Sequence, residues 1–181
     1  MSYKPITIYT PEDEEPHITA DDDAFIYYSL LGGRDGIFGM TCTKVDNNTV
    51  QLSAGGCTNR GHVLRVFGEN NITLTTGTAG TKRLDFIVAR FTKGGGETAD
   101  TFEIDVVEGT PYTTTPSIPT LDTSDLSAEG DVNEVALYEI HMNGTNLESI
   151  IQDMPSLPYP ILVGTSDPPA DAPNGTIYFK I

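Results

Sequence analysis

Apolar positions near the start of the chain recur with the period of an α-helix. Between residues 24 and 31 they are spaced three to four positions apart, which places them on one side of a helix. Thr19 and Asp22 match a capping box, and consecutive acids follow where the helix dipole favours negative charge. Two glycines end the pattern. The sequence therefore predicts one helix over about 20–31, with a buried face made of Ala24, Phe25, Tyr28 and Leu31.

Beyond residue 36 the apolar positions alternate with polar ones, which is typical of half-buried strands. Asn47 and Asn48 both tolerate positive φ and predict a tight hairpin turn, and Asn143-Gly144 predicts a type I′ turn in a second hairpin. In residues 101–109 hydrophobic and acidic side chains alternate, so one face of the sheet should be wet. The expected strands cover residues 3–10, 36–43, 49–53, 62–67, 72–76, 82–93, 101–109, 135–142 and 145–151.

Two stretches of the chain lack this alternation. Residues 110–133 have no periodicity and carry three prolines, so they are expected to form a functional loop, an arm or a covering strap. The segment from residue 154 holds six of the twelve prolines and two short apolar runs, at 161–163 and 176–181. These runs are too short to build a core of their own. We expect a small β-hairpin there that pairs with the main sheet or with another copy of the chain.

Together these patterns predict the fold class. We expect a mainly β protein, with an antiparallel β-sandwich or barrel-like domain over residues 1–153, one short N-terminal helix, and a Pro-rich C-terminal arm over residues 154–181. The length of 181 residues suits one domain with a small appendage. The 18 glycines and 12 prolines favour many turns and short strands over long helices.

The charge balance excludes several kinds of partner. With 26 acidic residues against 10 Lys and Arg, the formal net charge is −16. Such a chain has little from which to build the basic surface that binds nucleic acid or anionic lipid. No run approaches the roughly 18 apolar residues of a membrane span, so no membrane insertion is expected. The sequence shows no export signal, and we expect synthesis in a reducing bacterial cytoplasm, with Cys42 and Cys57 unbridged.

Clustered acids could form a calcium site or a pair of catalytic carboxylates, but a structural role explains each cluster better than a site does. Residues 12–15 and 21–23 lack the alternate spacing and the tight glycine turn of a calcium loop, so they fit a solvated linker and a helix start. Glu103, Asp105 and Glu108 are the strand acids that a glycosidase pair would use. Their alternation with apolar residues favours a solvent-facing role, and the chain has no Trp on which a sugar could stack.

The remaining candidates also have structural explanations. GTAGTKR at 77–83 lacks the spacing of a phosphate loop and precedes a strand, so a β-turn is expected. His62 and His141 fall within predicted strands, where a hydrogen-bonded structural role is expected. Asp85 lies in an apolar strand and needs a partner. Arg83, two residues away on the same strand face, is that partner, as a structural pair or an assembly contact. The sequence therefore assigns no catalytic, cofactor-binding or metal-ligating residue.

Several segments together resemble a family of bacteriophage tail and baseplate proteins that also occurs in prophages of Gram-positive hosts. The most specific piece is GTAGTKRLDFIVAR, which combines a turn and a strand. The sequence GTSDPPADAPNGTIYFKI at 164–181 also resembles a cap that is common in tail structural proteins. The other matching segments lie at 18–38, 48–66, 106–111 and 137–150, so the resemblance covers essentially the whole chain.

The resemblance implies a virion structural or adaptor subunit near the tail tip or baseplate, involved in tail assembly and host attachment. It supplies no catalytic residues, so no enzymatic activity is expected. The alternative is a carbohydrate-binding, receptor-binding module that contacts cell-surface saccharide, also without catalysis. Open strand edges and a stiff arm favour self-association, and tail-tip appendages of the resembled family are commonly threefold. We therefore expect a homotrimer, with a dimer as the alternative and other tail or baseplate proteins as partners.

Overall fold

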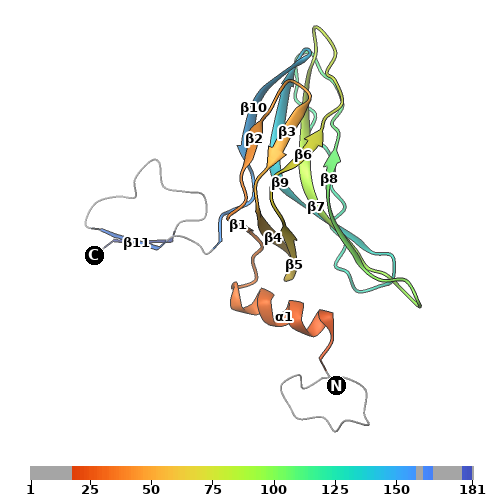
Figure 1. The fold of residues 1–181 in the computed structure, drawn as a ribbon, viewed down its shortest axis with the longest axis vertical. Helices are drawn as coiled ribbons and strands as arrows, with labels where there is room; N and C mark the ends of the chain where they lie inside the picture. The colour runs from red at the N-terminus through yellow and green to blue at the C-terminus, as the bar shows by residue number, and fades with distance from the viewer. Residues whose placement is uncertain (1–17, 158–160, 165–176, 181) are drawn as a thin grey trace.

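The computed structural model describes residues 18–157, 161–164 and 177–180. Figure 1 shows that this part of the chain is mainly β, with one helix below the sheets in this view. Helix α1 spans Ala20–Leu30, as predicted. The Thr19 hydroxyl accepts a hydrogen bond from the Asp22 N–H at 3.3 Å, and the Asp22 carboxylate accepts one from the Thr19 N–H at 2.8 Å. This is the expected capping box, which satisfies backbone donors that a helix start leaves open.

The buried side of α1 differs from the predicted face. Ala24 is buried, but Phe25 is 65% exposed and Tyr28 and Leu31 are only half-buried. Apolar residues lie on several sides of this helix, so their spacing does not single out one stripe. Helix α1 lies against Gly61, whose φ is +83° and whose backbone approaches the Ala24 carbonyl. A side chain at Gly61 would collide with the helix backbone, so a glycine is needed where α1 meets the sheet.

The strands of the described residues form four sheets, three of them antiparallel. The strand orders are β10-β9-β7-β8, β2-β3-β6, β1-β4-β5 and β11-β12. The strands are β1 (Ile37–Phe38), β2 (Cys42–Lys44), β3 (Thr49–Leu52), β4 (Gly55–Asn59), β5 (His62–Val66), β6 (Asn70–Thr73), β7 (Lys82–Thr92), β8 (Thr101–Val107), β9 (Val132–Asn143), β10 (Asn146–Gln152), β11 (Ile161–Gly164) and β12 (Ile177–Lys180).

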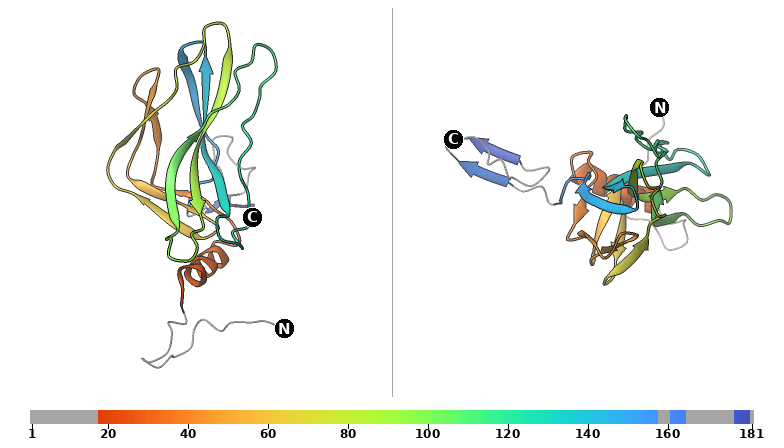
Figure 2. Two further views of the ribbon diagram at one scale, coloured as in Figure 1. Left: turned by 90° about the vertical axis from the view of Figure 1, so that its right-hand side faces the viewer. Right: turned by 90° about the horizontal axis from the view of Figure 1, so that it is seen from above.

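The main core lies between the four-stranded sheet and the two three-stranded sheets. Figure 2 shows the long strands β7, β9 and β10 on one side and the shorter strands on the other. Side chains of both layers meet in one buried cluster, including Ile37, Val50, Leu52, Cys57, Ile87, Leu137 and Ile140. Strands that present alternate residues to a shared core in this way form a sandwich. The predicted mainly β class, with an antiparallel sandwich and one N-terminal helix, is confirmed.

A strap covers the outer face of the four-stranded sheet. Outward-pointing side chains of β7 form a second buried cluster, against which Leu121 packs. Tyr112 exchanges two backbone hydrogen bonds with Lys82, at 2.7 and 2.8 Å, which fixes the start of the strap to the sheet edge. The aperiodic stretch predicted over 110–133 is therefore a covering strap, and β9 begins at its last two residues.

Both predicted hairpins are present, but their turn types differ from the prediction. β2 pairs with β3, and neither Asn47 nor Asn48 has a positive φ. The Asn48 N–H instead donates to the Asp46 carboxylate at 2.8 Å, the local bond of an Asx turn. β9 and β10 are joined by Gly144 and Thr145, of which only Gly144 has a positive φ, +59°. This is the pattern of a type II′ turn, so the type I′ prediction was wrong.

The continuous strand predicted over 36–43 was also wrong. β1 pairs with β4, whereas β2 pairs with β3 in a different sheet. Gly39 lies between them with a φ of +69°, a conformation that interrupts an extended strand. The alternation of apolar residues across this point therefore belongs to two strands.

The two short strands near the C-terminus pair only with each other. Their register is parallel, so the small β-hairpin expected there is not formed, and neither strand joins a main sheet. A parallel pair needs a connection of about a dozen residues, and residues 165–176 separate these strands. The rest of the Pro-rich arm and the strand predicted at 3–10 lie outside the described residues.

Candidate functional site

Arg83 and Asp85 form the buried ion pair that the sequence predicts. Their side chains are only 4% and 1% exposed, and Arg83 Nε and Nη2 donate to the two Asp85 oxygens at 2.8 and 2.9 Å. The Gly109 N–H also donates to Asp85 at 2.9 Å. The Thr75 carbonyl accepts from Arg83 at 2.6 Å, and Glu108 lies 3.1 Å from the guanidinium. Because neither charge reaches the surface, this pair is a structural element and not an assembly contact.

The three acids considered for catalysis are not brought together. Glu108 binds the guanidinium of Arg83, while Asp105 binds the separate guanidinium of Arg90. Arg90 also donates from Nε to Glu134 at 2.7 Å, across the β7–β9 pair. Glu103 is exposed on β8. Asp105 and Glu108 therefore neutralise a half-buried and a buried arginine, while Glu103 faces the solvent.

His62 links the start of β5 to both the core and α1. Its ring stacks on Phe91 with a centroid separation of 4.0 Å, and Nε2 lies 3.9 Å from the Asp21 carboxylate of α1. Burial lowers the pKa of His62 below its usual value, and the nearby Asp21 opposes only part of that change. The same Asp21 accepts a hydrogen bond from Lys93 at 2.8 Å. This cluster holds α1 on the sheet and has the structural role expected of a strand histidine.

The other sequence candidates also have local roles. His141 Nε2 lies 2.8 Å from Glu139 on the same face of β9. The segment at 77–83 forms a turn, in which the Thr81 N–H donates to the Thr78 carbonyl at 3.1 Å and Gly80 has a φ of +80°. The β-turn predicted there is confirmed.

Cys42 and Cys57 are free in the structure. Cys42 is half-buried and Cys57 is buried in the main core. Burial raises the pKa of each thiol to about 12. Both thiols are therefore protonated at neutral pH and poorly suited to nucleophilic or metal-binding chemistry.

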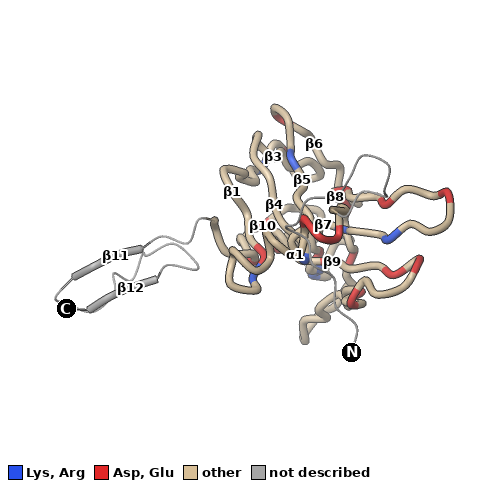
Figure 3. The backbone as a smooth tube through the Cα atoms, turned by 90° about the horizontal axis from the view of Figure 1, so that it is seen from below, with Lys and Arg blue, Asp and Glu red and all other residues tan. Residues whose placement is uncertain are grey.

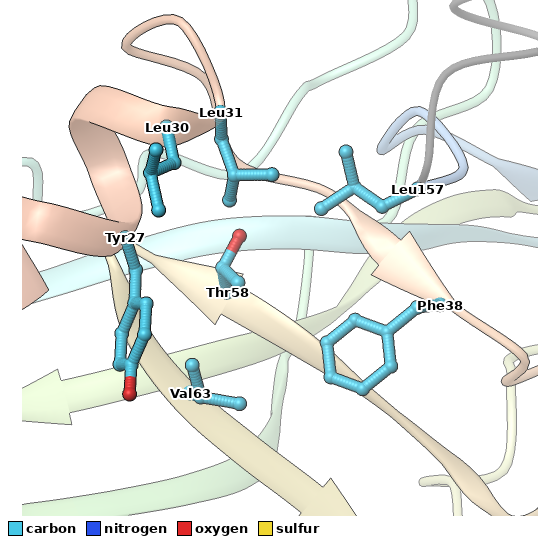
Figure 4. A pocket seen from close by; sticks show the side chains of 7 residues that line it. All are labelled: Tyr27, Leu30, Leu31, Phe38, Thr58, Val63 and Leu157. Atoms are coloured by element: carbon cyan, nitrogen blue, oxygen red, sulfur yellow. The ribbon is translucent and has the colours of Figure 1, made fainter.

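The most distinctive surface feature is an apolar pocket of about 350 Å³ between α1, β1, β4 and β5. Figure 4 shows side chains from α1, from β1 and β5, and from the segment after β10 converging on this space. Two of the lining side chains carry a hydroxyl, Tyr27 and Thr58, and the Thr58 hydroxyl accepts a hydrogen bond from the Gly36 N–H at 3.0 Å. The apolar lining consists of Tyr27, Leu30, Leu31, Phe38, Val63 and Leu157.

A second hollow continues this surface along β5. It shares Phe38 and Val63 with the apolar pocket and extends to Arg65 and Phe67. The Arg65 guanidinium stacks over the Phe67 ring at 4.5 Å from its centroid. We call the combined surface the α1–β5 face and define it by Tyr27, Leu30, Leu31, Phe38, Val63, Arg65, Phe67 and Leu157.

The α1–β5 face differs in charge from the rest of the chain. None of the residues that line either hollow is acidic, and Arg65 is their single charged residue. Elsewhere acidic residues are frequent, for example in the long loops at the right of Figure 3. Asp23 of α1 lines a neighbouring hollow that shares Tyr27 and Val63 with the face, so acids border the face without lining its two hollows. An exposed apolar surface whose hollows contain no acid, on a chain of net charge −16, is a feature of protein contacts.

Sequence analysis did not identify the α1–β5 face. Its residues come from four separate parts of the chain, and their assembly depends on how α1 and the segment around Leu157 lie over β1 and β5. One signal in the sequence points to it. The helix carries apolar residues on more sides than one packed face needs, which indicates a second apolar surface.

Neither a scan against protein-family models nor a search of curated proteins finds a match to this chain. Among the described residues no group of three or more His, Cys, Asp or Glu is arranged to hold a metal ion. The helix that the structure describes is not long and apolar enough to cross a membrane. The features of this chain that bear on its function are therefore the α1–β5 face and the resemblance in sequence.

Proposed function

We propose that this protein is a non-enzymatic structural or adaptor subunit of a phage or prophage tail tip or baseplate, and that it acts in tail assembly and host attachment. In this role it self-associates and contacts other tail proteins. A homotrimer is the form that the resembled family favours, and a dimer is the alternative.

The observation that carries the proposal is the α1–β5 face. It combines exposed Leu30 and Phe67, at 78% and 72% exposure, with an apolar pocket. Exposed apolar surface of this extent is a feature of protein contacts. The turn and strand of residues 77–93 support the same role through their resemblance to tail proteins. A subunit that is built to be contacted needs such a surface and needs no catalytic centre.

The alternative function is a receptor-binding module for cell-surface saccharide. A saccharide site needs several polar groups that converge beside an aromatic ring. In the apolar pocket, Tyr27 and Phe38 supply rings, but the hydroxyls of Tyr27 and Thr58 are the only polar side-chain groups in its lining, too few to bind a sugar. The chemistry of this pocket therefore favours a protein contact over a glycan.

Immunoelectron microscopy tests the proposed function. Antibodies against this chain are applied to particles released from a host that encodes it, and gold labels are mapped on head and tail. We expect labels at the distal end of the tail. Antibodies absorbed with the purified protein serve as the control. Labels on the head, or particles without label beside a strong signal in the soluble fraction, would contradict the proposal.

A further inference from the structure

We propose that the α1–β5 face is the surface on which a second copy of this chain docks. The inference deepens the structural role proposed above and rests on it, because it names the partner of the same surface. Three features of the described residues point to this partner: the exposed apolar area, the distribution of charge and the free edge of β5.

The exposed apolar area would supply about half of a standard subunit contact. An aromatic side chain carries about 200 Å² of surface, and a Leu or Val carries about 100 Å² of apolar surface by the usual transfer energies. On these values the four most exposed side chains of the face leave about 400 Å² in water. That is about half of the roughly 800 Å² that each partner contributes to a standard interface. Their exposed fractions are 78% for Leu30, 72% for Phe67, 50% for Val63 and 47% for Tyr27.

The charge distribution favours this face over others for contact between copies. Two chains of net charge −16 repel each other, and acidic residues at an interface would increase the repulsion. The two hollows of the α1–β5 face contain no acidic residue. A contact made through these two hollows therefore places no acidic lining residue of one copy against the other. Acidic residues outside the contact still repel each other between the two copies. Salt screens this repulsion, with a Debye length of about 8 Å at physiological ionic strength, so association should strengthen as salt is added.

The edge of β5 adds a backbone contribution. β5 is the last strand in the order β1-β4-β5, so one of its sides has no strand partner among the described residues. An open edge of this kind pairs with another strand unless it is covered or blocked by charge. The one charge along this edge, Arg65, is stacked over Phe67. A strand of a second copy laid along β5 would pair with the free edge and cover Val63 and Phe67.

Light scattering coupled to gel filtration tests the inference on the full chain at tens of micromolar. We expect the wild type to elute with the mass of two or three chains of 19.5 kDa. Leu30→Asp and Phe67→Asp should each shift it to one chain, because they place a carboxylate in the contact. Ile118→Asp is the matched control, since Ile118 is 69% exposed and lies on the strap, outside the face. It should keep the wild-type mass, and circular dichroism should show that all variants are folded.

Several results would overturn the inference. They are a wild type that is monomeric at these concentrations, a face variant that keeps its oligomeric mass, or a control that dissociates like the face variants.

Hydrogen exchange gives a second measurement that needs no substitution. Amides of residues 62–66 should exchange more slowly at high than at low protein concentration, and equal rates would contradict pairing at β5. If the protein is monomeric but antibodies against it still label phage tails, this interface is refuted and the proposed function stands. If the protein is an oligomer that is absent from particles, the proposed function is refuted and the interface stands.

Discussion

Replacement of Asp85 by Ala probes the structural element that the sequence and the structure identify together. The carboxylate is 1% exposed and accepts three hydrogen bonds, two from Arg83 and one from the Gly109 N–H. Its removal leaves a buried guanidinium whose remaining partners are Glu108 and the Thr75 carbonyl. Breaking a buried pair on one side costs about 3–5 kcal/mol. For a chain of this size that corresponds to a fall in Tm of about 6–20 °C.

Urea denaturation followed by far-UV circular dichroism measures the effect, because the chain has no Trp to report by fluorescence. Asp105→Ala is the matched control. Asp105 also pairs with an arginine, but its side chain is 43% exposed, and a surface pair contributes about 0–1 kcal/mol. The double variant Arg83→Met/Asp85→Leu should lose less stability than Asp85→Ala, since it removes the buried guanidinium together with its main buried partner. A loss below about 1 kcal/mol for Asp85→Ala would refute the reasoning.

Three further predictions concern the thiols, the helix contact and pH. Burial raises the pKa of Cys42 and Cys57 to about 12, so a thiol reagent at pH 8 should react slowly with folded protein and titrate two thiols after denaturation; fast reaction of the native protein would contradict this. Gly61→Ala should lower stability by at least about 1 kcal/mol, because the residue has a positive φ and lies against the backbone of α1; an unchanged urea midpoint would show that α1 can move away freely. The folded state holds His62 at a pKa below its usual 6.5. As the pH falls through about 6.5, the unfolded chain therefore binds more protons than the folded chain does. The free energy of unfolding should consequently drop between pH 7 and 5.5. His62→Gln should flatten that dependence, and an equal slope in both proteins would exclude His62 as its source.

The parts of the fold that depend on residues close together in the sequence were predictable from the sequence. Thr19 and Asp22 lie three positions apart, so the capping box and the start of α1 followed directly. Strand β7 and its hairpin partner β8 were also found, because β7 is a long apolar run and β8 alternates apolar with acidic residues. Arg83 and Asp85 share a strand face at a spacing of two, which made their pairing predictable.

The features that were missed depend on tertiary context. Asn47 and Asn48 tolerate positive φ, but the Asp46 carboxylate offers their backbone a local hydrogen bond and a different turn forms. The break at Gly39 is invisible in the alternation, because the apolar residues on its two sides stay in phase while the strands join different sheets. The α1–β5 face is assembled from residues far apart in sequence. No local pattern places Leu157 beside Leu31.

Quantitative mass spectrometry of purified particles tests the central claim most directly. Peptides of this chain are counted against those of the major tail protein, in intact particles and in tail-less heads from the same lysate. The proposed structural role predicts a small, fixed number of copies in every intact particle and none in the heads. Absence from intact particles, or an amount that varies with each wash of the preparation, would contradict the role of a tail subunit.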